Sequence, residues 1–141
     1  MHLPSRAATS AAGFSLGAAL AELSGPWTAV QWPAATVLVT NQGGPKVGNE
    51  NWVQLFQATV GRAYKYVWRL DEVPGIPPLA EYVPVPGTIW MLEDAVLLES
   101  RPPYPLGVTT WEDHDCERYY VPLLYNATGV EVPAYIFEAT E

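Results

Sequence analysis

The densest group of ionisable side chains lies in residues 111–120, which read Trp-Glu-Asp-His-Asp-Cys-Glu-Arg-Tyr-Tyr. A carboxyl group that serves as both acid and base needs a pKa raised towards neutrality. Burial beside an aromatic ring, or beside other carboxylates, raises it. Glu112 has both kinds of neighbour, in Trp111 and Asp113. Acid and base chemistry is therefore one interpretation of this segment, and a solvated acidic loop is the alternative.

Two further arrangements of this segment involve His114. With Glu112 and the flanking aspartates it could form a metal cluster, but adjacent residues in a loop rarely converge on one ion. With Cys116 it could form a thiolate and base pair, but a buried or spare thiol is the commoner role of a lone cysteine. We therefore predict no metal site and no cofactor.

A second candidate site is the glycine-bearing loop that follows an apolar run at residues 36–40. The run is β-branched and reads as a buried strand, which Asn41-Gln-Gly-Gly-Pro then stops. Gly43 and Gly44 would let backbone N–H groups form a nest for a carboxylate. Asn41 and Gln42 could hold an amide or a carboxylate by hydrogen bonds. We predict that these four residues bind a ligand.

Composition limits the class of protein and its partners. With 141 residues, 49% of them hydrophobic and 16% charged, the chain can bury one core, so we expect one domain. A net charge of −8 with only seven Lys and Arg argues against binding to nucleic acid or to an anionic membrane. The single cysteine excludes an internal disulfide framework, and a reducing cytoplasm is the simplest compartment.

The elements that would position these residues are mostly strands. Fourteen prolines and eleven glycines, with few long periodic segments, favour a strand-rich and loop-rich domain. Short helices are predicted at residues 49–58, capped by Asn49 or Asn51, and at 93–100. Strands are predicted at residues 36–40, 63–70, 83–92, 119–125 and 130–138, the last two as a hairpin around the turn 126–129.

The first 27 residues have a different composition, rich in Ala, Ser, Gly and Leu. We divide the chain into residues 1–27, an extension or a short helix, and residues 28–141, a single domain. A helical turn is predicted at residues 18–23, ended by Ser24-Gly25-Pro26. A cleaved targeting peptide is a third interpretation, so organelle targeting stays open. The apolar stretch at residues 11–23 is too short to span a bilayer.

This order of elements resembles the gamma-glutamylcyclotransferase-like fold family over residues 36–141. The similarity is carried by Tyr-Lys-Tyr-Val-Trp at 64–68, Val-Pro-Gly-Thr-Ile-Trp-Met-Leu at 85–92 and Ala-Tyr-Ile-Phe at 134–137. A related domain, the C-terminal domain of allophanate hydrolase, is similar through Pro105-Leu-Gly107 and the loop at residues 43–49. The resemblance implies an α+β fold with a small mixed or antiparallel, barrel-like sheet and short helices.

The resemblance also implies a chemistry. In the cyclotransferases a glutamate moves a proton while the substrate α-amine attacks its own γ-carbonyl to close a lactam. The resemblance implies Glu112 as the catalytic carboxyl, with Asp113 as its rival, because Glu112 lies a few residues before Tyr119. Tyr119 joins the predicted ligand-binding set. The loop at residues 41–44 departs from the Tyr-Gly-Thr or Tyr-Gly-Ser pattern of the cyclotransferases, and it places Asn41 near the histidine of the allophanate hydrolase domain.

Two classes of function follow. The first is a small-molecule enzyme acting on a γ-glutamyl amide or a urea-like amide, with Glu112 as acid and base. The second is a non-catalytic ligand-binding or accessory domain on the same fold. A strand-rich assembly protein is a third and unrelated class. The expected partner is a small-molecule substrate or ligand, and both a homo-oligomer and a larger enzyme partner are left open.

Overall fold

The computed structural model describes residues 7–93, 96–102 and 109–122. In these residues the chain forms a five-stranded sheet in the order β1-β2-β3-β4-β5. The first four strands are parallel, and β5 is antiparallel to β4. Their bounds are β1 Ala8–Phe14, β2 Thr36–Gln42, β3 Arg62–Trp68, β4 Thr88–Met91 and β5 Leu97–Leu98.

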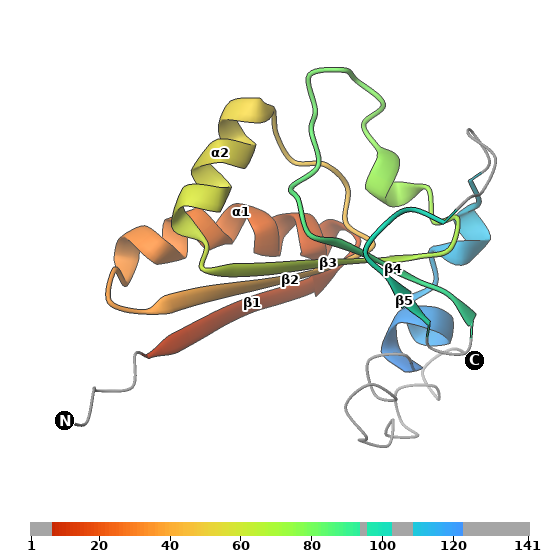
Figure 1. Cartoon of the computed structure of the whole chain (residues 1–141), viewed down its shortest axis with the longest axis horizontal. Coiled ribbons are helices and arrows are strands. Elements are labelled where there is room, and N and C mark those ends of the chain that lie inside the picture. Colours follow the sequence, from red (N-terminus) through yellow and green to blue (C-terminus); the bar gives the residue numbers. More distant parts are fainter. Residues whose placement is uncertain (1–6, 94–95, 103–108, 123–141) are drawn as a thin grey trace.

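Two helices make the first two of the three crossover connections between the parallel strands. Helix α1 (Leu16–Gln31) joins β1 to β2, and α2 (Glu50–Thr59) joins β2 to β3. Both helices lie on the same face of the sheet (Figure 1). Because the strands are parallel, their carboxyl ends meet at one edge, which is where open α/β sheets place their ligands.

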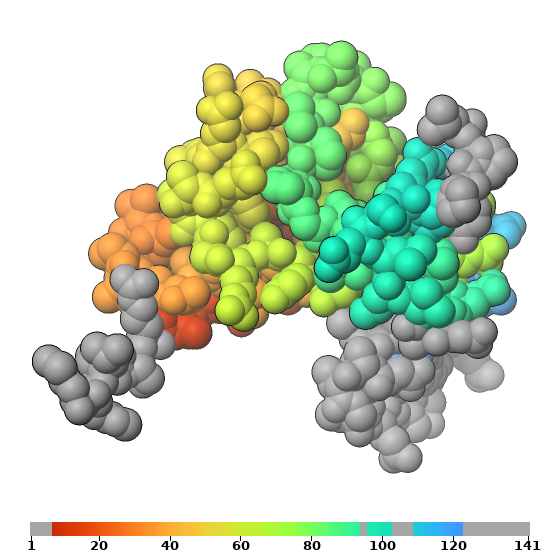
Figure 2. Space-filling model, in the orientation of Figure 1, coloured from red at the N-terminus to blue at the C-terminus, as the bar shows by residue number. Residues whose placement is uncertain are grey.

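The hydrophobic core lies between this face of the sheet and the helices. Along β2, Val37, Val39 and Asn41 are buried while the residues between them are half-exposed, as the two-residue period of a strand requires. Asn49 caps α2 by accepting a hydrogen bond from the Trp52 N–H at 3.1 Å. The segment before β4 packs beside α2 (Figure 2). The buried residues of this cluster are Val37, Val39, Val53, Phe56, Val60 and Val85.

The predicted fold class, an α+β domain with a mixed or antiparallel barrel-like sheet, is wrong. The sheet is open and mostly parallel, since its first three strands alternate with helices along the chain. The first strand and helix of that alternation escaped prediction. Strand β1 reads Ala-Thr-Ser-Ala-Ala-Gly-Phe, in which Thr9 is the one β-branched residue, whereas β2 has a nearly continuous β-branched run.

Individual elements fared unevenly. The strands predicted at 36–40 and 63–70 and the helix at 49–58 are confirmed as β2, β3 and α2. The strand predicted at 83–92 forms only at Thr88–Met91, and the helix predicted at 93–100 is wrong because β5 lies there. The helix predicted at 18–23 runs from Leu16 to Gln31, through Pro26.

The predicted terminal hairpin is wrong where the structure describes it. Residues Cys116–Tyr120 form a π-helix, η4, and residues 121 and 122 are also helical. The rest of the hairpin, residues 123–138, lies outside the described residues, as does Pro105-Leu-Gly107.

One face of α1 exposes a row of large apolar side chains spaced three and four residues apart. Among the described residues this row is Leu16, Leu20, Leu23, Trp27 and Val30, each between 43% and 69% exposed. A row of this size marks a surface that can contact another apolar surface. Across the described part of the chain, no helix combines the length and the apolar character needed to cross a membrane.

Candidate active site

A sharp turn joins β1 to α1 and presents Ser15 at the carboxyl edge of the sheet. Ser15 has φ 54° and ψ −123°, a conformation that L side chains rarely adopt. The turn reads Gly13-Phe-Ser-Leu-Gly17. A Cβ on Gly13 would lie 2.3 Å from the Gly17 carbonyl group, so the turn requires glycine at position 13. This is the geometry of a nucleophile elbow, in which strain holds a serine hydroxyl exposed.

The Ser15 hydroxyl begins a chain of hydrogen bonds to two distant parts of the sequence. Its Oγ lies 2.8 Å from Nε2 of His114, and Nδ1 of His114 lies 2.8 Å from Oδ2 of Asp71. Asp71 follows β3, and His114 follows the 3₁₀ helix η3 (Trp111–Asp113). A serine, a histidine and a carboxylate connected in this way can perform nucleophilic acyl transfer.

Asp71 is fully enclosed, and both of its oxygens are satisfied. Its side chain is 0% exposed. Oδ1 accepts the Val73 N–H at 2.9 Å, and Oδ2 accepts the Tyr120 hydroxyl at 2.5 Å in addition to its contact with His114. The Tyr120 oxygen in turn accepts the Trp68 N–H at 3.0 Å. Burial, together with Asp71, raises the pKa of Tyr120, so its hydroxyl stays protonated and donates to the carboxylate.

Aromatic rings and a backbone contact fix the position of His114. The Phe14 ring stacks on it with centroids 4.6 Å apart, and the Trp111 ring meets it edge-on at 6.3 Å. Asp113 fastens η3 to the end of β3 because its Oδ2 accepts the Leu70 N–H at 3.1 Å. The imidazole is therefore held between the nucleophile and the carboxylate by groups outside the triad.

The start of α1 supplies a donor for a developing oxyanion. Leu16 is the first residue of the helix, so its N–H lies outside the i→i−4 ladder. In the α/β-hydrolase elbow this N–H, which follows the nucleophile, forms part of the oxyanion hole. The helix has no acidic residue in its first turn, so no side-chain charge there opposes its positive end.

The predicted acid and base, Glu112, lies in η3 and is exposed. Its backbone N–H donates to Oγ1 of Thr110 at 3.1 Å. Two neighbouring acids have structural contacts. Asp113 bonds Leu70, and Asp115 accepts the Arg118 N–H at 2.9 Å at the start of η4. This acidic segment thus contains His114 of the triad, while Asp113 and Asp115 make structural hydrogen bonds and Glu112 is exposed.

The predicted binding loop, residues 41–44, lies beside the triad but is engaged within the fold. The Gln42 carbonyl accepts the Ser15 N–H at 2.9 Å, and the Gly43 N–H donates to the Tyr66 carbonyl at 2.8 Å. The Gly44 N–H donates to Oδ1 of Asn41 at 2.9 Å. Gly43 has φ 58°, and a Cβ there would lie 2.8 Å from Oδ2 of Asp71. The loop therefore packs against the triad through Gln42 and Gly43, and its polar groups are used within the fold.

Tyr119 and Cys116 take packing positions in η4. The Tyr119 ring stacks on Trp68 with centroids 4.8 Å apart, and the Arg118 guanidinium lies 5.2 Å from its centroid. Burial raises the pKa of the Cys116 thiol, with Asp115 and Glu117 adding to the effect. A raised pKa disfavours the nucleophilic thiolate. In addition, both nitrogens of His114 are occupied by Ser15 and Asp71.

A second buried polar group lies under the helix layer and consists of Glu22, Asn41 and Lys65, each no more than 2% exposed. The Asn41 amide donates to Oε2 of Glu22 at 2.6 Å. Burial raises the pKa of Glu22, which the charge of Lys65 and the Asn41 hydrogen bond oppose. Burial lowers the pKa of Lys65, which the charge of Glu22 opposes. Nζ of Lys65 has no hydrogen-bond partner in the described structure.

Sequence comparison decides the family. A family model described as Lipase (class 3) matches residues 6–81, which is more than half of the chain and includes Ser15 and Asp71. The chain belongs to the class 3 lipase family. No curated protein sequence matches it significantly. The resemblance to gamma-glutamylcyclotransferases and to the allophanate hydrolase domain is wrong, because the family match is to lipases and the mostly parallel sheet is not the barrel-like sheet that the resemblance implied.

Solved lipase structures share the fold. A triacylglycerol lipase described as having a serine protease triad at its catalytic centre has TM-score 0.64 and 24% identity, over 79% of this chain and 47% of that one. The Rhizomucor miehei triacylglyceride lipase has TM-score 0.62 and 22% identity, over 74% of this chain and 45% of that one. Lipase II from Rhizopus niveus has TM-score 0.59 and 23% identity, over 74% of this chain and 44% of that one. The chain thus spans less than half the length of each of these lipases.

The signals that could have revealed this class 3 lipase site were present in the sequence. Gly13-Phe-Ser-Leu-Gly17 fits the G-x-S-x-G elbow, and Ser15, Asp71 and His114 follow the Ser, Asp, His order of α/β-hydrolases. The motif lies within residues 1–27, whose composition differs from that of the rest of the chain, so it does not stand out as part of the domain. The predicted cyclotransferase activity and the accessory-domain alternative are also wrong, because both depended on the resemblance to those families.

Proposed function

We propose that this class 3 lipase domain hydrolyses carboxylic esters by acyl transfer through Ser15. The observation that carries the proposal is the continuous hydrogen-bonded line from Ser15 Oγ through His114 to the enclosed Asp71, with both links at 2.8 Å. The family match and the lipase-like fold support esters of fatty acids as the substrate class.

In the first half of the reaction, Ser15 Oγ attacks the ester carbonyl carbon while Nε2 of His114 removes its proton. Asp71 holds Nδ1–H and stabilises the imidazolium that forms. The Leu16 N–H donates to the carbonyl oxygen as it becomes an oxyanion. When the tetrahedral species collapses, His114 gives its proton to the departing alcohol, and the acyl group stays on Ser15 as an ester.

In the second half, a water molecule replaces the alcohol. His114 removes a proton from the water as it attacks the acyl carbon, and the same N–H stabilises the second oxyanion. Collapse returns the proton to Ser15 Oγ and releases the carboxylic acid. One ester and one water are consumed, one alcohol and one acid are produced, and the triad is restored.

The test is hydrolysis of a series of p-nitrophenyl esters, from acetate to octanoate, and of tributyrin. We expect turnover that Ser15→Ala lowers by about 10⁴-fold to 10⁶-fold, the range seen when a member of a catalytic triad is removed. The matched control is Ser10→Ala, an exposed serine of β1 that lies outside the triad and should keep the rate within twofold. Equal rates for the wild-type protein and Ser15→Ala would refute the proposal.

Expectations about partners and compartment stay predictions. The net charge of −8 still argues against nucleic acid as a partner. Cytoplasmic location, the boundary at residue 27 and the oligomeric state each need their own measurement.

A further inference from the structure

A cavity of about 340 Å³ opens beside the carboxyl end of β3, away from Ser15. Its lining comes from β3, β4, the 3₁₀ helix η1 (Val73–Gly75) and the segments around residues 84, 101 and 109. Its walls are largely apolar, from Val67, Pro74, Pro84 and Trp90. The volume lies at the lower end of the range for small-molecule sites.

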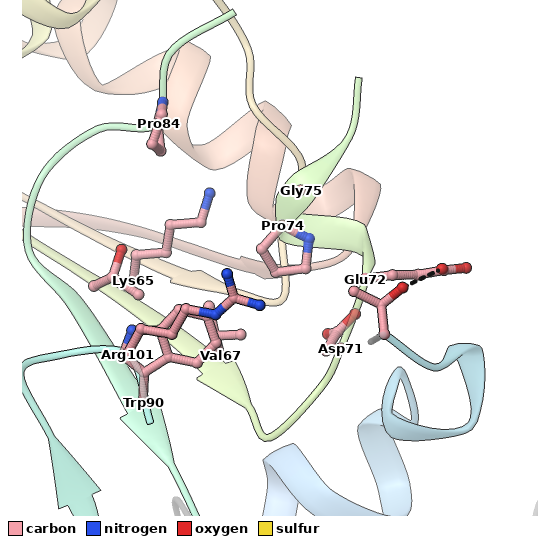
Figure 3. Close-up of a pocket in the computed structure, with 11 residues that line it drawn as sticks. Lys65, Val67, Asp71, Glu72, Pro74, Gly75, Pro84, Trp90 and Arg101 are labelled. Atoms are coloured by element: carbon pink, nitrogen blue, oxygen red, sulfur yellow. Dashed lines mark hydrogen bonds between the residues drawn. The ribbon is translucent and has the colours of Figure 1, made fainter. Parts of the chain in front are cut away.

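Two cations project into this space. Figure 3 shows the Lys65 and Arg101 side chains reaching into the same region, between Pro84 and Pro74. Lys65 is 2% exposed, and its Nζ has no hydrogen-bond partner in the described structure. The charge of Glu22 offsets part of the cost of burying this ammonium, but its hydrogen-bonding capacity stays unused, which is costly in a buried group. Arg101 lies over the Trp90 ring at 5.9 Å, and no ion pair of Arg101 occurs among the described residues.

Two carboxylates also line the cavity, and their positions leave the cations available. The Asp71 oxygens are taken by Val73, His114 and Tyr120. The Glu72 carboxylate points away from both cations, and its Oε2 accepts the Thr109 hydroxyl at 3.0 Å (Figure 3). Its Oε1 is buried without a partner in the described structure. Negative charge is thus concentrated at one end of the cavity and positive charge at the other.

We propose that this cavity binds a small aliphatic carboxylate, with the carboxylate between the Lys65 ammonium and the Arg101 guanidinium and the alkyl chain against Val67, Pro74 and Trp90. The space is too large for a lone inorganic anion and its walls are apolar, which selects an anion with a short hydrocarbon tail. Free carboxylic acids and the acids released by ester hydrolysis share this chemistry. The site is separate from Ser15 and does not depend on the proposed hydrolysis.

The test is calorimetric titration of the whole protein with acetate, butyrate, hexanoate and octanoate. Inorganic phosphate and hexan-1-ol serve as the anion without a tail and the tail without an anion. We expect affinity to rise about fourfold per methylene until the chain outgrows the cavity, as burial of each CH₂ predicts. Hexan-1-ol and phosphate should bind at least tenfold more weakly than hexanoate.

Variants identify the groups involved. Lys65→Met should weaken hexanoate binding by roughly 10-fold to 100-fold, the range for a charged hydrogen bond in a buried site. Arg101→Gln, at an exposed position, should weaken it by roughly twofold to fivefold. Glu72→Gln removes a negative charge from the cavity and should strengthen binding. The last two variants carry the test if Lys65→Met does not fold.

Three results would overturn the site: no saturable hexanoate binding, equal affinity for hexanoate and hexan-1-ol, or variants that leave the affinity unchanged. Titration of Ser15→Ala separates this site from the reaction. We expect unchanged hexanoate affinity there. Loss of binding in that variant would place the carboxylate at the nucleophile and refute the separate site, while leaving the ester hydrolase proposal intact.

Discussion

The molecule contains two buried polar groups that differ in how fully they are satisfied. Around Asp71, every side-chain oxygen has a donor, and the hydrogen bonds run outward to the half-buried Ser15. Around Lys65, Asn41 bonds Glu22, but the ammonium has no partner in the described structure. The two groups lie close together, because residues 41–44 adjoin both of them. The Asn41 amide bonds Glu22, and a Cβ on Gly43 would lie 2.8 Å from Oδ2 of Asp71.

This difference in hydrogen bonding suits the two groups to different tasks. A satisfied network in a low-dielectric site is rigid and holds its donors and acceptors in a fixed geometry, as acyl transfer requires. An unsatisfied cation keeps a free-energy cost that a bound anion can remove. Chemistry is therefore expected at Ser15, and binding without chemistry at Lys65.

The largest effect should come from uncoupling the acid of the triad. Asp71→Asn leaves His114 without the carboxylate that fixes its tautomer and stabilises its cation. We expect kcat for a soluble p-nitrophenyl ester to fall about 10⁴-fold. Asp115→Asn, which alters a cap of η4 outside the triad, is the control and should change kcat less than tenfold. A fall of similar size in both variants would remove the special status of Asp71.

The next largest effect concerns the elbow. Gly13→Ala places a Cβ 2.3 Å from the Gly17 backbone, so the turn must distort. We expect the free energy of unfolding to fall by about 3 kcal/mol or more, measured by urea denaturation. The control is Gly17→Ala, where nothing lies within 4 Å and the helix should gain up to about 1 kcal/mol. Comparable losses in both variants would contradict the elbow geometry.

A smaller effect is expected at the support of Asp71. Tyr120→Phe removes the hydroxyl that donates to Asp71 and leaves the Trp68 N–H without its acceptor. Because that N–H is buried, we expect a loss of about 1–3 kcal/mol in the free energy of unfolding, with a fall in kcat. Urea denaturation and ester kinetics measure the two effects. Unchanged stability would show that this network is less tightly coupled than its distances imply.

In the group around Lys65, removal of buried polar groups should not lower the free energy of unfolding. Replacing Glu22 and Lys65 together, by Gln and Met, removes both buried charges at no net change in charge. We expect the free energy of unfolding to stay level or rise by about 1 kcal/mol. Each single variant should be less stable than the double variant, because it leaves one charge buried alone. A large loss in the double variant would show that the charged pair stabilises the fold.

The smallest expected effect is a pH dependence of the difference in free energy of unfolding between this double variant and the wild-type protein. Glu22 has a raised pKa, so its contribution to stability is present below its unfolded value of 4.5 and is lost as pH rises through the folded pKa. Lys65 has a lowered pKa, so its contribution is present above 10.5 and is lost as pH falls through the folded pKa. The stability gap between the double variant and the wild-type protein should therefore be widest near neutral pH and narrow towards pH 4.5 and 10.5. Urea denaturation at several pH values measures it, and a gap independent of pH would contradict the burial of charge.

Local signals in the sequence sufficed for part of the fold. The β-branched run of β2, the cap of α2 at Asn49 and the alternation in β3 depend on neighbouring residues, and they were predicted. Strand β1 could not be recognised by propensity, because its small residues owe their conformation to pairing with β2. Helix α1 continues through Pro26, against the sequence signal, and the neighbouring Gly25 packs so closely that a Cβ there would lie 2.9 Å from the Val39 and Val60 side chains.

The site could be predicted in part. The segment around His114 was singled out by its charge density, but the relevant partners lie 43 and 99 positions away in the chain. Nothing in the sequence neighbours of Asp71 indicates that Tyr120 will enclose it. The elbow motif was the one local signal of the nucleophile. Parallel strand order then brings the ends of β1 and β3 to the same edge, and this follows from topology rather than from any short pattern.

The most direct test of the central claim is covalent labelling of the folded protein with a fluorophosphonate ester, read by intact mass and peptide mapping. We expect a single adduct on the peptide that contains Ser15, absent in Ser15→Ala and formed at least about 10³-fold more slowly in Asp71→Asn, because attack requires the oriented imidazole. A folded wild-type protein that takes up no label, or a Ser15→Ala variant that is labelled at the same rate, would contradict the central claim.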